Sequence, residues 1–340
     1  MSGIRAALIA ALADGAVHSG SDIAQRLACS RTAIWKHLNE LKAVGLQVDA
    51  RPGIGYQLAQ RLELLDRELI LRGLSMQTSA ALDCLELHDV IESTSERLRE
   101  LPSPSTGRFD AVLAEYQLGG RGRRGRQWLS PFGSGLCLSV NHRFENIPDT
   151  LSALSLAVGV GVCRVLRDDI TTQIGLKWPN DIVAANSKLG GLLIDVQGEA
   201  DGPISVIIGI GMNFDVSSSM TEQVASTGGL PPIGLRELVR EVDPSGPDIS
   251  RNDLAARLIN AMYTVLTEFE QNGFAPFVDE WCSYDWLANR SVVAKNGQRS
   301  ISGTARGIAT DGALLIETNG DLQRLVSGEV SLRPGCEGKI

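Results

Sequence analysis

The sequence lacks the marks of several large classes of protein. Its six cysteines are scattered without a CxxC pair, which indicates neither a disulfide framework nor a zinc site and favours a reducing cytoplasm. Its longest apolar stretch, 151–166, is interrupted by Ser and Gly and is too short to span a bilayer, so we expect a buried helix and no membrane contact. No small-residue cleavage pattern follows the apolar run at 1–13, which therefore predicts an amphipathic helix and not a signal peptide.

Lysine is also scarce, since only six of the 32 basic residues are lysines and the other 26 are arginines. A lysine within a candidate site is therefore of interest for its compact ammonium group, although a bias in base composition would produce the same ratio. The net charge of −8 excludes a general electrostatic attraction to nucleic acid. Any contact with DNA must be local, and 340 residues leave room for two or three domains.

The most unusual stretch that is present is 119–128, GGRGRRGRQW, with four glycines and four arginines in ten residues. Glycine lets the backbone approach a ligand, guanidinium groups match carboxylates and phosphates, and the final Trp128 can stack on a flat ring. The stretch predicts a loop that closes over an anionic ligand bearing a flat group. The alternative is a flexible basic loop that touches nucleic acid or nothing. Its glycine spacing fits neither a P-loop nor a dinucleotide-binding fingerprint.

Residues 1–60 have the pattern of a winged helix-turn-helix, similar to DNA-binding domains of that class. Ser21 or Asp22 is the expected cap of the second helix, and Ser30 is the expected cap of the third. Helices are predicted over 4–13, 21–27 and 31–44, and strands over 46–50 and 56–58 flank a glycine-rich turn that forms the wing.

This segment carries six basic and four acidic side chains, so its net charge is positive in an otherwise acidic chain. A local positive charge on a recognition helix and wing favours contact with the DNA backbone and bases. The alternative is a small helical module for protein contact. The candidate DNA contacts are Arg31, Thr32, Lys36 and Arg51.

The remaining chain changes its pattern twice. Residues 61–80 predict a helical linker, 81–286 alternate between strands and helices, and 287–340 predict short antiparallel strands with hairpin turns. Residues 215–250, rich in Ser, Gly and Pro, predict a long surface excursion.

Three further segments offer polar groups that could meet the loop over 119–128, called the Arg/Gly loop below. Residues 177–181, KWPND, supply a cation, an amide and a carboxylate around a rigid proline. Residues 188–191, KLGG, place a lysine before two glycines, and 209–213, GIGMN, end a strand on an amide side chain. Taken singly, each also fits packing or a turn.

Taken in order, these segments resemble the bifunctional biotin–protein ligases that also repress the biotin operon. The resemblance covers nearly the full length and is most specific in the Arg/Gly loop and KWPND. Its motifs are Ser93-Thr94, Glu115-Tyr116-Gln117, Gly120–Trp128, Lys177–Asp181, Lys188–Gly191, Gly209–Asn213 and a closing segment from Arg306 to Arg333.

The resemblance implies an α+β, multidomain fold. We expect a winged helix-turn-helix domain over 1–60, a linker helix over 61–80, a mixed α/β biotin/lipoate-ligase-like catalytic domain over 81–286 and a small SH3-like β-barrel over 287–340. The implied reaction joins biotin to ATP with Mg²⁺, giving biotinoyl-5′-AMP and pyrophosphate. Biotin then passes to a lysine of the biotin carboxyl carrier protein of acetyl-CoA carboxylase. Biotinoyl-AMP is the implied corepressor, favouring a homodimer that binds a palindromic operator.

The resemblance also implies residue roles. The groups that stabilise charge in the reaction are Lys188, Arg121 and Arg123. The groups that hold the fused rings and carboxylate of biotin are Ser93, Thr94, Gln117, Arg121, Gly122, Arg123, Lys188, Gly190 and Gly191. The groups that contact the nucleotide are Arg123, Arg126, Trp128, Lys177, Asn180, Lys188 and Asn213. Asp181 is expected to bind Mg²⁺ or to organise Lys177, and Glu329 and Arg333 to assist ATP or the carrier.

One departure from the family is Ser95, where we expect Asn. Two other functions remain open on the sequence. A lipoate–protein ligase would share the catalytic architecture, but the Arg/Gly loop and the DNA-binding pattern argue against it. A transcription factor with a catalytically idle ligand-sensing domain is the other, and the retention of Lys188 and all four loop arginines argues against it.

Overall fold

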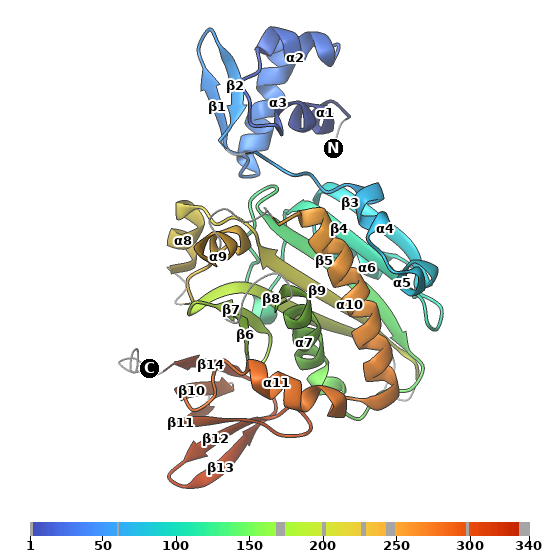
Figure 1. The fold of residues 1–340 in the computed structure, drawn as a ribbon, viewed down its shortest axis with the longest axis vertical. Helices are drawn as coiled ribbons and strands as arrows, with labels where there is room; N and C mark the ends of the chain where they lie inside the picture. Colours follow the sequence, from blue (N-terminus) through green and yellow to red (C-terminus); the bar gives the residue numbers. More distant parts are fainter. Residues whose placement is uncertain are drawn as a thin grey trace.

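The structure, a computed structural model of the chain, describes residues 3–59, 61–167, 174–198, 202–225, 229–242, 249–296 and 299–332. Figure 1 shows a small N-terminal domain, a large central domain and a C-terminal strand domain arranged along the long axis. The predicted α+β fold, with three differently built parts, is confirmed. In the described part of the chain, we find no helix with the length and apolar character that crossing a membrane requires.

The N-terminal domain is the predicted winged helix-turn-helix. Ile34, Leu38 and Leu41 are buried on the inner face of the third helix, as their spacing predicts. Ser30 caps that helix, and its hydroxyl accepts a hydrogen bond from the Ala33 N–H at 3.1 Å. The elements are α1 (Gly3–Leu12), α2 (Gly20–Arg26), α3 (Arg31–Ala43), β1 (Val48–Arg51) and β2 (Gly55–Leu58), and the two strands pair in antiparallel register.

The predicted cap of α2 is wrong. The helix begins at Gly20, and the hydroxyl of Ser19 accepts a hydrogen bond from the Ser21 N–H at 3.2 Å. Ser21 and Asp22 therefore lie inside the first turn, where Asp22 still complements the positive end of the helix dipole.

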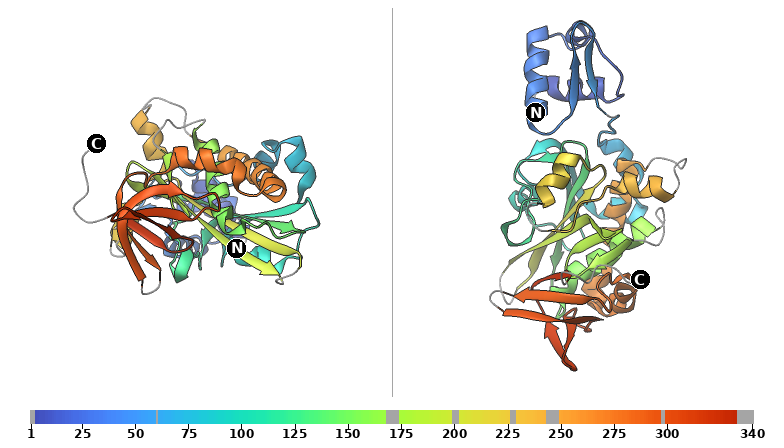
Figure 2. Two further views of the ribbon diagram at one scale, coloured as in Figure 1. Left: turned by 90° about the horizontal axis from the view of Figure 1, so that it is seen from below. Right: turned by 90° about the vertical axis from the view of Figure 1, so that its left-hand side faces the viewer.

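The linker contains two short helices, α4 (Arg67–Arg72) and α5 (Met76–Ala81), after an extended segment that leaves the winged domain. Figure 2 shows this extended segment passing from the winged domain to the central domain. Asp66 caps α4, accepting hydrogen bonds from the N–H groups of Glu68 and Leu69. The predicted linker is thus helical only from residue 67 onward.

The central domain is built on a seven-stranded sheet with the order β3-β4-β5-β9-β8-β7-β6. Only β3 and β4 run parallel, and the other neighbours are antiparallel. The strands are β3 (Leu82–Ile91), β4 (Phe109–Gln117), β5 (Gly135–Phe144), β6 (Ile174–Lys177), β7 (Asp181–Ala184), β8 (Ser187–Gly198) and β9 (Ile204–Asn213).

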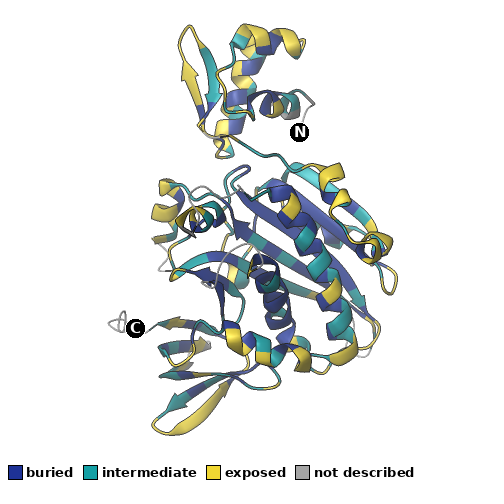
Figure 3. Cartoon of the chain, in the orientation of Figure 1, coloured by how far each residue is buried: buried dark blue, intermediate teal, exposed yellow. Residues whose placement is uncertain are grey.

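Helices cover both faces of this sheet, so its central strands are buried on both sides (Figure 3). On β4, Val112 packs toward α6 (Thr94–Glu100), whereas Ala111 and Leu113 join the main core with α7 (Leu154–Arg167) and α10 (Arg251–Asn272). The apolar stretch that begins at Leu151 is a buried helix, as predicted, after a single 3-10 turn over Leu151–Ala153.

The predicted surface excursion over 215–250 is only partly correct. It contains α8 (Ser218–Ala225) and α9 (Leu235–Val242), and Leu235 is fully buried. The Lys188 N–H donates to the Pro231 carbonyl at 2.7 Å, and the Ile233 N–H donates to the Lys188 carbonyl at 3.0 Å. This segment therefore joins the central domain beside β8, and its apolar residues anchor it there.

The C-terminal domain is a five-stranded antiparallel sheet with the order β13-β12-β11-β10-β14. Helix α11 (Val278–Tyr284), preceded by a 3-10 turn over Ala275–Phe277, connects it to α7 and β6 of the central domain. The strands are β10 (Ser291–Asn296), β11 (Arg299–Ile308), β12 (Leu314–Thr318), β13 (Asp321–Leu325) and β14 (Glu329–Leu332).

Candidate active site

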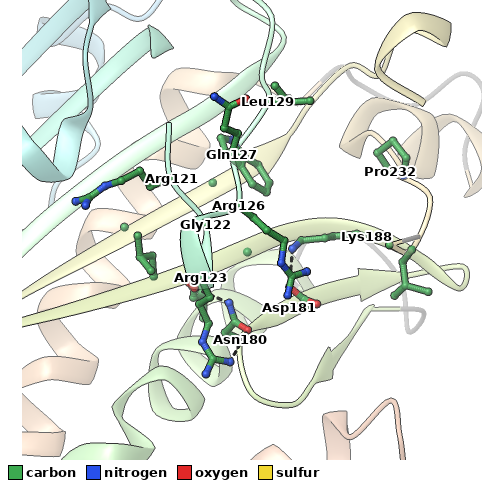
Figure 4. A pocket seen from close by; sticks show the side chains of 18 of the residues that line it. Arg121, Gly122, Arg123, Arg126, Gln127, Leu129, Asn180, Asp181, Lys188 and Pro232 are labelled. Atoms are coloured by element: carbon green, nitrogen blue, oxygen red, sulfur yellow. Dashed lines mark hydrogen bonds and ion pairs between the residues drawn. The ribbon is translucent and has the colours of Figure 1, made fainter. Parts of the chain in front are cut away.

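A pocket of about 980 Å³ collects nearly all of the predicted ligand-binding residues. One wall is the Arg/Gly loop after β4, the base includes β7, β8 and β9, and further walls come from residues 229–232 and the C-terminal domain. Figure 4 shows Arg121, Arg123 and Arg126 of the loop together with Asn180, Asp181 and Lys188 around it. Segments far apart in the sequence thus meet at one site.

The Arg/Gly loop is folded back on itself. The Gly122 N–H donates to the Arg126 carbonyl at 2.7 Å, and the Trp128 N–H donates to the Gly120 carbonyl at 2.8 Å. Arg124 at the tip has a φ of +58°, a conformation that costs a non-glycine residue energy. The hydrogen bonds close the loop into a small hairpin.

Trp128 lies directly on the glycines of two strands. A Cβ atom at Gly211 would stand 2.5 Å from the indole ring, and one at Gly191 would stand 3.6 Å from it. Gly211 therefore has to lack a side chain for the indole to occupy this place. The Lys188 ammonium is 5.8 Å from the indole centroid, within the range of a cation–π contact.

Two lysines share one carboxylate beside the indole. The Lys188 Nζ is 2.6 Å from one oxygen of Asp181, and the Lys177 Nζ is 3.2 Å from the other. Burial works to raise the pKa of Asp181, but the Lys188 and Lys177 ammonium groups outweigh it and hold that pKa below its ordinary value. Asp181 is thus a fixed anion that orients two cations.

Two asparagines brace this cluster. The Asn213 amide donates to the Lys188 carbonyl at 3.1 Å, and the Asn180 amide donates to the Leu192 carbonyl at 2.7 Å. The Asn180 oxygen accepts from Arg123 at 3.3 Å. Burial, followed by the neighbouring Arg124 guanidinium, lowers the pKa of Arg123. In the absence of a carboxylate among its described partners, Arg123 is suited to an external anion.

Arg121 and Arg126 do not converge on Lys188 in this structure. Arg121 turns to the other side of the loop (Figure 4), where it pairs with Glu96 and approaches Asp195 at 3.5 Å. Arg126 pairs with Glu329 of the C-terminal domain. Only part of the predicted cation group therefore gathers around Lys188, and the rest is held by acidic residues at the rim.

Hydroxyl and amide groups form a second, polar part of the pocket. Gln117 accepts from both the N–H and the hydroxyl of Thr94, at 2.8 and 3.1 Å. The buried Ser139 hydroxyl lies 2.7 Å from that of Thr94 and 3.0 Å from that of Ser95. Ser93 caps α6 through a 3.5 Å hydrogen bond from the Glu96 N–H. These groups can bind both donors and acceptors of a polar ring.

Among the predicted residues that the structure describes, Gly190 does not line the pocket. Gly190 is buried within the sheet, where a Cβ atom would stand 2.8 Å from the Gly211 carbonyl, whereas Gly191 lines the pocket. Arg333 lies outside the described residues. Gly122 lines the pocket as expected.

The predicted DNA contacts all lie on the winged domain, away from the pocket. All four side chains are exposed, on the outer face of α3 and at the end of β1; they are Arg31, Thr32, Lys36 and Arg51.

Sequence reasoning missed several residues of the pocket. Ser139 and the Pro231–Pro232 pair line it, and so does Lys295 from the C-terminal domain. Their neighbours in the sequence carry no motif, so only the folded chain brings them to the site. For Lys295, the scarcity of lysine was the one usable signal.

Comparison with known proteins settles the family. Residues 87–213 match the model of the biotin/lipoate A/B protein ligase family, residues 5–57 match an HTH domain, and residues 288–333 match the biotin protein ligase C-terminal domain. The bifunctional ligase/repressor BirA of Salmonella typhimurium is 38% identical over 330 residues, covering 96% of each chain. The chain belongs to the bifunctional ligase/repressor family.

More distant proteins give the same result. The bifunctional ligase/repressor BirA of Bacillus subtilis is 30% identical over 92% of this chain and 93% of its own. A solved structure of the Aquifex aeolicus biotin protein ligase in complex with biotin and ATP matches with a TM-score of 0.56 and 27% identity. It covers 74% of this chain and 98% of its own. The chain is thus a ligase that carries a helix-turn-helix domain.

Proposed function

We propose that this ligase/repressor joins biotin to ATP and transfers the biotinoyl group to a lysine of the biotin carboxyl carrier protein of acetyl-CoA carboxylase. The observation that carries the proposal is the shared pocket. In it, the hydroxyl and amide groups around Gln117 lie in the same cavity as Lys188, Asp181 and Arg123. The first set suits the fused polar ring of biotin, and the second suits a carboxylate beside a phosphate.

In the first step, a biotin carboxylate oxygen attacks the α-phosphorus of ATP and pyrophosphate leaves. Both reactants are anions, so the rate depends on fixed cations that neutralise them. We assign that role to Lys188, whose ammonium is oriented by Asp181, and to Arg123. Arg121 is assigned to the biotin carboxylate, which requires it to leave Glu96.

In the second step, the amine of the carrier lysine attacks the acyl carbon and AMP leaves. Lys188 and Arg123 again stabilise the negative charge that collects on the phosphate. Trp128, Asn180, Asn213, Lys177 and Arg126 are assigned to the nucleotide. The indole offers a flat surface beside Lys188 for the adenine or the fused rings.

Mg²⁺ is expected to reach the pocket bound to ATP. The described residues contain no cluster of three or more His, Cys, Asp or Glu side chains that could hold a metal ion. Both oxygens of Asp181 already face ammonium groups, so this carboxylate does not fit as a metal ligand. Of the two roles expected for Asp181, we retain the organisation of the lysines.

The decisive experiment is the exchange of labelled pyrophosphate into ATP by the purified full chain with Mg²⁺. We expect exchange that depends on biotin and is not supported by lipoate. Exchange with lipoate alone would identify a lipoate ligase, and binding of biotin without exchange would identify an idle sensor.

We also propose that the winged domain binds an operator as a homodimer when biotinoyl-AMP fills the pocket, with the protein in the cytoplasm. The exposed Arg31, Thr32 and Lys36 on α3, with Arg51 on the wing, support contact with DNA. Sedimentation and fluorescence anisotropy on promoter DNA of biotin synthesis genes, with and without biotin plus ATP, test this. A monomer that binds no DNA in either state would disprove it.

A further inference from the structure

Six basic side chains of the described residues line the pocket, and four of them are paired with carboxylates. The pairs are Lys177 and Lys188 with Asp181, Arg121 with Glu96 and Asp195, and Arg126 with Glu329. Arg123 and Lys295 form no ion pair with any residue that the structure describes. These two side chains are therefore the cations whose counter-charge has to come from a ligand or from solvent.

Lys295 stands where the C-terminal domain faces the Arg/Gly loop. On β10 it lies directly opposite Glu329 of β14, so both side chains share one face of the sheet. The next cross-strand pair, Ala294 and Val330, is buried on the other face. Glu329 in turn pairs with Arg126, and the Gly328 carbonyl accepts from Arg123 at 3.4 Å.

The charges around this point do not balance. Among the described residues, Glu329 lies with Arg123, Arg124, Arg126 and Lys295. Asp181 also acts on Arg123, but it is already shared by Lys177 and Lys188. The pocket edge formed by the loop and the C-terminal domain therefore has an excess of positive charge. An anion with several charges would bind at this edge more strongly than a singly charged one.

We propose that Lys295 binds the β- and γ-phosphates of ATP, the pyrophosphate that leaves in the first step. The inference rests on the proposed function. As the carboxylate oxygen bonds to the α-phosphorus, the bond from that phosphorus to its bridging oxygen breaks, and the electron pair goes to the departing pyrophosphate. Lys295 neutralises that added charge, while Lys188 stays with the α-phosphate. The half-reaction that starts from biotinoyl-AMP contains no pyrophosphate and does not need Lys295.

The test separates the two half-reactions in Lys295→Ala, Lys295→Arg and the full wild-type chain. For Lys295→Ala we expect the KM for ATP in pyrophosphate exchange to rise about tenfold, as for the loss of one charged contact to phosphate. The KM for biotin and the rate of transfer from preformed biotinoyl-AMP to the carrier should stay at wild-type values. Lys295→Arg should bring the KM for ATP most of the way back to the wild-type value. Arg324→Ala is the matched control, because it removes an exposed cation of the same domain that pairs with Asp311 and does not line the pocket.

Titration calorimetry with inorganic pyrophosphate and with ATP gives a readout that needs no turnover. Weaker binding of both by Lys295→Ala, with unchanged biotin binding, supports the proposal. Unchanged pyrophosphate and ATP binding, or slower transfer from biotinoyl-AMP, would overturn it, the latter by placing Lys295 with the carrier. A wild-type chain without biotin-dependent exchange refutes the proposed function instead, and the pyrophosphate titration still decides the role of Lys295.

Discussion

At the scale of single residues, Lys188 is the side chain on which both steps of the proposed reaction depend. We expect Lys188→Ala to lower pyrophosphate exchange at least about 100-fold, because a fixed charge at the reacting phosphate is lost. Asp181 keeps Lys177 as a partner, so the fold should survive. Exchange assays with circular dichroism measure both effects, and Lys42→Ala on the exposed face of α3 is the control. A folded variant with the wild-type exchange rate would refute this role.

Asp285 is a half-buried carboxylate that makes the stability of the chain depend on pH. Burial raises its pKa to about 6 from an ordinary value of 3.8, and one of its oxygens has no hydrogen-bond partner among the described residues. The native state thus holds the proton more tightly than the unfolded chain, so stability is lost as the pH rises from about 4 through 6. Above that range, the difference between the two pKa values corresponds to a loss of about 3 kcal/mol in the free energy of unfolding.

Asp285→Asn removes this cost and keeps an oxygen for the Leu287 N–H, which donates to Asp285 at 2.9 Å. We expect the variant to unfold at higher urea concentration than wild type at pH 8 and at the same concentration at pH 4. The comparison of the two midpoints at each pH measures the effect. A variant that is no more stable than wild type at pH 8 would show that burial does not destabilise the ionised carboxylate.

At the scale of elements, one buried arginine ties the linker to β4 and α10. Arg251 is fully buried and donates to Glu115 at 2.8 Å, to the Glu63 carbonyl at 2.6 Å and to the Gly135 carbonyl at 2.7 Å. Glu115 also accepts from the Leu65 N–H at 2.6 Å. This network fixes the end of β4, from which the Arg/Gly loop departs.

We expect Arg251→Met to lower the free energy of unfolding by about 3–5 kcal/mol, because Glu115 is left buried without its cation. Adding Glu115→Leu should recover part of that loss, so the two changes should not be additive in urea unfolding. Arg306→Met breaks an exposed pair with Glu317 and should cost less than about 1 kcal/mol. Additive losses from the two buried changes would contradict this account of the network.

The elements also show what the sequence could and could not predict. Periodicity placed α3, the length of an apolar run placed the buried α7, and a glycine-rich motif placed the loop, because local sequence carries that information. Pairing across long separations carries no local signal, which is why the contacts of Arg121 with Asp195 and of Lys188 with Pro231 were not foreseen. The N-cap Ser19 was missed because serines at 19 and 21 and Asp22 are equally good caps in isolation.

At the scale of the whole molecule, the segment that follows the Arg/Gly loop packs into the hydrophobic core of the winged domain. Phe132, four residues beyond Trp128, is 3% exposed and packs in the cluster of α1, α2 and α3. Its N–H donates to the Val44 carbonyl at 3.3 Å, and Pro131 lies against Gly45. The segment that leaves the pocket is therefore anchored in the DNA-binding domain. A shift of the Arg/Gly loop would reach that domain through these packed residues.

Phe132→Ala should weaken this anchor, with effects on both the winged domain and the Arg/Gly loop. Truncation of a buried phenylalanine costs about 3–5 kcal/mol, and here the loss falls on the junction between two domains. We expect calorimetry to show the winged domain melting separately and at a lower temperature, and the KM for biotin to rise because the loop over 119–128 is less ordered. Phe132→Leu, which keeps most of the apolar contact, should lie close to wild type in both measurements. If Phe132→Ala melts in one transition at the wild-type temperature and keeps its KM, the two domains are coupled through the linker network of Arg251 and not through this core.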